Sequence, residues 1–153
     1  MTTPFGFQRA EQRSRHHYPA PPEAVFPLLC PVREYDWIAP WRCRMIWSAS
    51  GVAEDNCVFV TDFPEPRGPE VWVVCRYTPG RGIGFVRTGP HRVTRLDIQL
   101  EPDGDGGTRA LWIHTVTALT AEGNHQVANL DPVGYETEMR TLERMLVHYL
   151  TTG

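Results

Sequence analysis

The residue best suited to acid–base chemistry is His114, which lies in an otherwise apolar, strand-like run from Leu111 to Val116. An ordinary histidine exchanges protons near neutral pH, so a cavity-facing His114 could act as general acid or base. Tyr77 or Asp97 could assist it, although the strand pattern predicts Asp97 on the opposite face. The structural alternatives are a histidine on the convex face of its sheet, or a buried histidine with satisfied hydrogen bonds.

Tryptophans form the second candidate group. The chain has five, at positions 37, 41, 47, 72 and 112. Some could line a pocket and stack on a flat apolar ligand. Large aromatic side chains mostly fill cores, however, and Trp37 and Trp41 could simply fix a short helix onto the sheet.

Two arginines, Arg87 and Arg92, lie on the predicted inner face of the sheet, near strand ends. There a guanidinium could bind a ligand carboxylate or phosphate. In a reaction, Arg87 or Tyr77 could polarise a carbonyl. The alternative is that both arginines extend into solvent, since charged side chains are rarely buried.

Composition excludes several other chemistries. All 15 of the Lys and Arg residues are Arg, so lysine-dependent catalysis is excluded. Neither a C-x-x-C pair nor H-E-x-x-H occurs, and we expect no metal and no cofactor. The glycines of Gly80–Gly84 join two strands instead of opening a helix, which argues against a dinucleotide loop.

Charge and hydropathy limit the partners. A net charge of −3 with dispersed arginines disfavours a nucleic-acid partner. No uncharged apolar run approaches the roughly 20 residues that cross a bilayer, and the N-terminus lacks an apolar signal core. We therefore expect a cytoplasmic protein without membrane insertion.

The spacing of apolar residues predicts the elements that must position these side chains. The chain of 153 residues, 41% hydrophobic and 22% charged, fits one soluble domain over residues 1–153. A first strand over Phe5–Tyr18 and two short helices, Pro22–Leu29 and Val32–Ile38, are expected. Period-two patterns then predict six strands: Arg42–Ser50, Cys57–Phe63, Glu70–Thr78, Gly82–Thr88, His91–Glu101 and Thr108–Leu119.

The C-terminal stretch returns to a helical period. A helical turn is predicted over Ala121–Asn129, and a long amphipathic helix from Asp131 or Pro132 to Leu150. Because the strand connections are short, the strands should be antiparallel neighbours. An α+β fold follows, in which a curved seven-stranded antiparallel sheet carries the long helix across its concave face.

Alternation assigns the faces of the central strands. A two-residue Gly89-Pro90 turn would pair Thr88 with His91. The side chains predicted to face the helix are Ile83, Phe85, Thr94, Leu96 and Ile98, and those predicted to face water are Gly82, Gly84, Arg95, Asp97 and Gln99. For the last strand both faces stay open: Trp112, His114 and Val116, or Leu111, Ile113 and Thr115.

The chain resembles the START, polyketide cyclase and birch-pollen-allergen superfamily, the helix-grip fold also called SRPBCC. The resemblance covers nearly the whole chain and is carried by Tyr18–Phe26, by Leu28–Trp37 with the step to Trp41, by Gly106–Arg109, and by the terminal helix. It implies an elongated, mostly apolar cavity between sheet and helix, in which members bind lipids, sterols or polyketides and some catalyse cyclisation or dehydration. The superfamily has no universal catalytic residues, so the resemblance assigns none here.

We therefore expect a hydrophobic small molecule as partner, bound between the sheet and the last helix. The expected ligand contacts are Trp37, Trp47, Tyr77, Phe85, Arg87, Leu96, Ile98, Trp112, Met139 and Leu142. Two alternatives stay open: a polyketide cyclase or dehydratase with His114 as acid or base, and a protein-interaction domain with a packed interior and no ligand. A homodimer also stays open.

Overall fold

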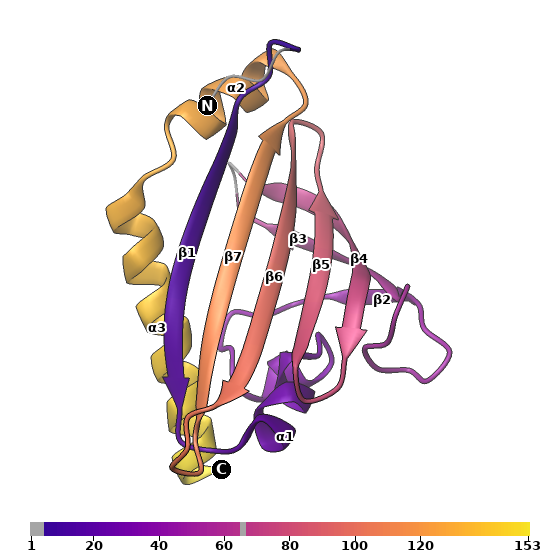
Figure 1. The fold of residues 1–153 in the computed structure, drawn as a ribbon. Helices are drawn as coiled ribbons and strands as arrows, with labels where there is room; N and C mark the ends of the chain where they lie inside the picture. Colours follow the sequence, from indigo (N-terminus) through magenta and orange to yellow (C-terminus); the bar gives the residue numbers. More distant parts are fainter. Residues whose placement is uncertain (1–4, 65–66) are drawn as a thin grey trace.

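A computed structural model describes residues 5–64 and 67–153, and confirms the predicted α+β helix-grip architecture (Figure 1). Seven antiparallel strands form one sheet in the order β1-β7-β6-β5-β4-β3-β2. The strands are β1 (Arg9–Tyr18), β2 (Arg44–Trp47), β3 (Val58–Phe63), β4 (Gly68–Thr78), β5 (Gly82–Thr88), β6 (Arg92–Pro102) and β7 (Thr108–Ala118). The helices are α1 (Pro22–Val25), η1 (Phe26–Leu29), η2 (Arg33–Asp36), α2 (Ala121–Ala128) and α3 (Pro132–Thr152).

The two short helices after β1 are less regular than predicted. The expected helix Pro22–Leu29 is one α-helical turn, α1, followed by the 3₁₀ turn η1. Pro27 lies in this second turn, and its missing N–H prevents regular α-helical hydrogen bonding there. The second predicted helix is reduced to the 3₁₀ turn η2.

The pairing of β5 with β6 corrects the predicted register. Thr88 pairs with Val93 and not with His91, because the loop contains four residues and closes through a hydrogen bond from the Gly89 N–H to the Arg92 carbonyl. The shift is two residues, so every side chain keeps its face. The inner-face set with Ile83, Phe85 and Leu96 is therefore buried as predicted.

The water-facing set needs one correction. Arg95 and Gln99 are exposed as predicted, but Gly82 and Gly84 are buried. The Arg76 side chain lies over both glycines, and at Gly82 an added Cβ would meet its guanidinium. Arg76 is held there by Asp97, at 2.7 Å from Nη2 to Oδ1.

The facing of β7 is settled by its two neighbours. Leu96 pairs with His114 and Ile98 pairs with Trp112, which places the side chains of the set Trp112, His114 and Val116 on the inner face. Trp112 and Val116 are each 5% exposed. His114 therefore faces the helix side of the sheet.

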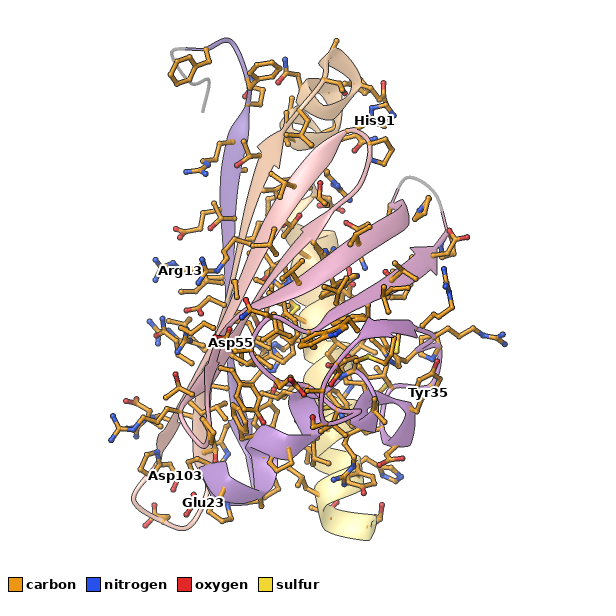
Figure 2. The ribbon with its side chains drawn as sticks, turned by 90° about the vertical axis from the view of Figure 1, so that its right-hand side faces the viewer. Arg13, Glu23, Tyr35, Asp55, His91 and Asp103 are labelled. Atoms are coloured by element: carbon orange, nitrogen blue, oxygen red, sulfur yellow. The ribbon has the colours of Figure 1, made fainter. Side chains whose placement is uncertain are left out.

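The long helix α3 covers the concave side. Figure 1 shows it running beside β1, and in the rotated view of Figure 2 it passes behind the strands over most of their length. The Asp131 side chain caps its N-terminus by accepting a hydrogen bond from the Val133 N–H. Met139 and Leu146 are its most buried side chains. None of the helices in the described ranges is long and apolar enough to span a membrane.

Candidate functional site

A cavity of about 730 Å³ lies between the sheet and α3. Its volume falls within the range typical of small-molecule sites, about 300–1,000 Å³. The inner-face side chains of β5, β6 and β7 form its floor, and the apolar side of α3 forms its roof. The apolar lining from these elements comprises Phe85, Leu96, Ile98, Trp112, Met139 and Leu142.

Aromatic rings form one wall of the cavity. Phe59 of β3 stacks on Trp72 of β4 with ring centroids 5.2 Å apart, and Trp41 meets Trp72 edge to face at 6.2 Å. The indole N–H groups have partners outside the cavity: Trp41 donates to the Pro31 carbonyl and Trp72 to the Thr61 hydroxyl. The rings therefore present apolar surface to the interior.

A buried ion pair interrupts this apolar lining. Arg87 lies in register with Trp72 on one side and Thr94 on the other, and its guanidinium carbon is 4.8 Å from the Trp72 ring centroid. Its Nε is 3.5 Å from a carboxylate oxygen of Glu70, and the two side chains are 8% and 1% exposed. Burial lowers the pKa of Arg87 to about 10, so the guanidinium stays charged at neutral pH.

Two further arginines line the same region. Arg67 lies 3.6 Å from a carboxylate oxygen of Glu138 on α3. Arg92, at the start of β6, forms no ion pair with any residue in the described ranges, and burial lowers its pKa. The polar region thus contains the guanidiniums of three arginines from β5, β6 and the loop before β4.

His114 forms a hydrogen-bonded pair with α3. Its Nδ1 lies 2.8 Å from the Tyr135 hydroxyl, which also donates to the Gln12 carbonyl. Burial, together with the smaller effect of the charges of Arg87 and Arg67, lowers the pKa of His114 to about 3. The imidazole is therefore neutral at pH 7 and a weak base, which makes it poorly matched to acid–base cycling.

Glu34 of η2 is a further titratable group in the cavity wall. It lines the cavity beside Ile38 and Trp41, and its carboxyl makes no hydrogen bond or ion pair within the described part of the chain. Burial raises the pKa of Glu34 well above its ordinary value. A carboxyl with a raised pKa keeps its proton to higher pH than an ordinary glutamate, and in that form it can donate a hydrogen bond or a proton to a ligand.

The structure brings together His114 and seven of the predicted ligand contacts. These line the cavity: Phe85, Arg87, Leu96, Ile98, Trp112, Met139 and Leu142. Arg87 is buried and paired, not extended into solvent as the alternative held.

Three predicted contacts lie elsewhere. Trp37 is buried beneath η1 and donates its N–H to the Leu28 carbonyl, so it fixes the short helices. Trp47 follows a bulge in the edge strand β2 and is 54% exposed. Tyr77 follows the β4 bulge and packs edge to face on Phe26, at a centroid distance of 5.1 Å.

Several lining residues are missing from the predicted set: Glu34, Trp41, Phe59, Trp72 and Tyr135. Tyr135 shares the helical stripe of Met139 and Leu142, so the spacing alone could have included it. Phe59 and Trp72 depend on the β3–β4 register, which the long Pro64–Pro69 connection leaves open. No pattern in the sequence distinguishes Glu34 from an exposed glutamate.

A metal site finds no support in the geometry. Over residues 5–64 and 67–153, no group of three or more His, Cys, Asp or Glu side chains is arranged to hold a metal ion.

Fold and cavity together define a helix-grip protein with a hollow interior, and solved structures share this architecture. No protein-family model matches the chain, and no curated protein matches it. An uncharacterised protein from Rhizobium leguminosarum superposes with a TM-score of 0.69 at 14% identity, over 96% of this chain and 97% of that one.

Two similar structures have informative names. The Aha1 dimer from Colwellia psychrerythraea has a TM-score of 0.64 at 16% identity, over 94% of this chain and 98% of its own. DynU16, a protein in the dynemicin biosynthetic locus, has a TM-score of 0.62 at 18% identity, over 94% of this chain and 48% of its own. At these identities the likeness establishes the fold alone.

Proposed function

We propose that the protein binds an apolar small molecule in the cavity between the sheet and α3. The observation that carries the proposal is the cavity of about 730 Å³, with an aromatic wall and an apolar helix roof. Such a volume left empty forfeits dispersion contacts that a folded chain normally makes. A ligand that fills it recovers those contacts.

The cavity favours a ligand-binding role over the alternative of a protein-interaction domain with a packed interior. The comparisons are compatible with either role, since one similar structure is named a dimer of Aha1 and another belongs to a biosynthetic locus. The cavity inside this chain supports the ligand-binding role.

The test is a titration with N-phenyl-1-naphthylamine, a neutral dye whose emission rises in apolar surroundings. We expect saturable binding. Leu142→Glu should weaken it by about tenfold or more, because a carboxylate in the apolar roof must be desolvated when the dye enters. Val133→Glu serves as the matched control on the same helix, since Val133 is 75% exposed and lies outside the cavity. Absence of binding, or equal binding by both variants, would refute the proposal.

A second candidate function, acid catalysis on a carbonyl substrate, is favoured by Glu34. Its raised pKa makes the carboxyl hold its proton to higher pH, so that it can donate a proton to a carbonyl oxygen, and general acid catalysis contributes about 10²- to 10⁴-fold. His114 and Tyr135 would then orient the substrate by hydrogen bonds. This is a cyclase- or dehydratase-type role.

Mass spectrometry of a linear poly-β-carbonyl substrate incubated with the protein tests this candidate. We expect a cyclised or dehydrated product whose rate of formation falls at least 10²-fold in Glu34→Gln. Glu23→Gln, an exposed glutamate in α1, should leave the rate unchanged. Equal rates in the two variants would remove Glu34 from the mechanism.

A further inference from the structure

Polar and apolar side chains are segregated along the cavity. One row across the inner face runs from Trp72 through Arg87 and Thr94 to Val116, set by direct cross-strand pairing. On β5, β6 and β7 the rows below it toward α1 are apolar except for His114, and β1 adds the polar Gln12 to the cavity lining in the row of His114. An occupant that satisfies both regions is therefore amphiphilic.

The arginines of the polar region have unused hydrogen-bonding capacity. Arg87 is 7% exposed, lines the cavity, and its Nε is sealed from solvent without a hydrogen-bond partner among the described residues. Its contact with Glu70, at 3.5 Å, is an ion pair and not a hydrogen bond. Arg92 lines the cavity without an ion pair in residues 5–64 and 67–153. A buried guanidinium with free N–H groups is costly unless a ligand accepts from it.

Among the charges that the structure describes there, one guanidinium has no ion-pair partner. Arg67 is matched by Glu138 and Arg87 by Glu70, which leaves Arg92. Asp131 also lines the cavity, with its carboxylate at the N-terminus of α3, which it caps. A single unpaired guanidinium suits a monoanion such as a carboxylate better than a phosphate monoester, which carries nearly two charges at neutral pH.

We propose that the occupant is an amphiphilic carboxylic acid, whose carboxylate lies between Arg87 and Arg92 and whose apolar body extends over Leu96, Ile98 and Trp112 toward α3. This inference rests on the proposed binding function and names its ligand class. Guanidinium groups bind carboxylates through paired, charge-assisted hydrogen bonds, which are stronger in a partly desolvated site.

Displacement of N-phenyl-1-naphthylamine by a matched pair, dodecanoate and dodecanamide, tests the inference. Both have the same apolar chain, so a difference between them reports the head group. We expect dodecanoate to bind about tenfold tighter than dodecanamide in the unaltered protein, as a charge-assisted contact should give. Arg92→Gln should reduce this advantage to threefold or less. Arg95→Gln, on the exposed face of the same strand, should leave the advantage intact.

The double variant Arg87→Met with Glu70→Leu removes both partners of the buried pair, so that neither charge is left alone in the interior. We expect it to lose the preference for the acid over the amide. The binding function and the carboxylate inference have different refuting results. If the dye does not bind, the binding function is wrong. If the dye binds and acid and amide compete equally, or the preference survives in Arg92→Gln, the carboxylate inference is overturned.

Discussion

His114 shows how the surroundings of a single residue decide its chemistry. Its position, facing the cavity from the middle of β7, is the one that the acid–base hypothesis requires. Its pKa of about 3 leaves it neutral and weakly basic, because burial and the nearby arginines both oppose the imidazolium form. Its hydrogen bond to Tyr135 makes it a link between the sheet and α3 instead.

The lowered pKa of His114 makes folding sensitive to acid. Between pH 6.5 and about 3 the unfolded chain binds a proton at this residue and the folded chain does not, so stability falls as the pH falls. From pH 7 to pH 5 this proton uptake lowers the unfolding free energy by about 2 kcal/mol. We therefore expect the unfolding free energy of His114→Gln to fall by about 2 kcal/mol less than that of the unaltered protein between pH 7 and pH 5. Urea denaturation of both proteins at the two pH values measures this difference.

Two comparisons isolate the effect of His114. Glu34, with its raised pKa, changes stability in the opposite direction, but it does so equally in both proteins. His148→Gln, at an exposed position of α3, should keep the full pH dependence. A His114→Gln protein with an unchanged pH slope would show that the imidazole titrates normally in the folded chain.

At the scale of elements, α3 both anchors itself and roofs the cavity, through different residues. Leu146 is fully buried and does not line the cavity, whereas Leu142 borders it. Leu146→Ala should cost about 2–5 kcal/mol of unfolding free energy, because it creates a void in packed core. Leu142→Ala, which only widens an existing space, should cost less than half as much. Denaturant titrations of both variants measure this, and equal losses would mean that the helix is packed uniformly along its length.

Periodicity was sufficient to predict the elements and their order. Period-two runs located β2 to β7 within a few residues, and the helical stripe located α3, because each element has one apolar face and that face fixes the period. Register was harder to predict. The loop between Thr88 and Val93 is two residues longer than the two-residue turn suggested by Gly89-Pro90, and turn length depends on local hydrogen bonding that spacing does not encode.

Cavity-lining residues could be predicted where their position depends only on the face of the strand or helix that they occupy. They could not be predicted where their position depends on which residues lie next to them on adjacent strands. Leu96, Ile98 and Met139 follow directly from alternation and helical period. The burial of Arg87 does not, since it requires Glu70 on the adjacent strand and Trp72 beneath the guanidinium. Trp47, a predicted ligand contact, lies outside the cavity lining for a related reason, because a bulge in the edge strand β2 turns its side chain outward.

At the scale of the whole molecule, the cavity couples ligand binding to global stability, because sheet and helix must both be in place for the cavity to exist. A ligand that binds only the folded chain adds about 2.7 kcal/mol at 100 times its dissociation constant. Backbone amides in the middle of β6 and β7, such as those of Leu96 and Trp112, should exchange with solvent only through global opening.

Hydrogen exchange followed by mass spectrometry therefore offers a direct test. Saturation with N-phenyl-1-naphthylamine at 100 times its dissociation constant should slow exchange of these central amides about 100-fold. The amides of α3 around Met139 and Leu142 should slow as well, since release of the helix destroys the site. The last residues of α3, near Thr152, should change little because a helix end frays without opening the cavity. If exchange slows only in one surface loop and the central strands are unaffected, the dye binds outside the cavity.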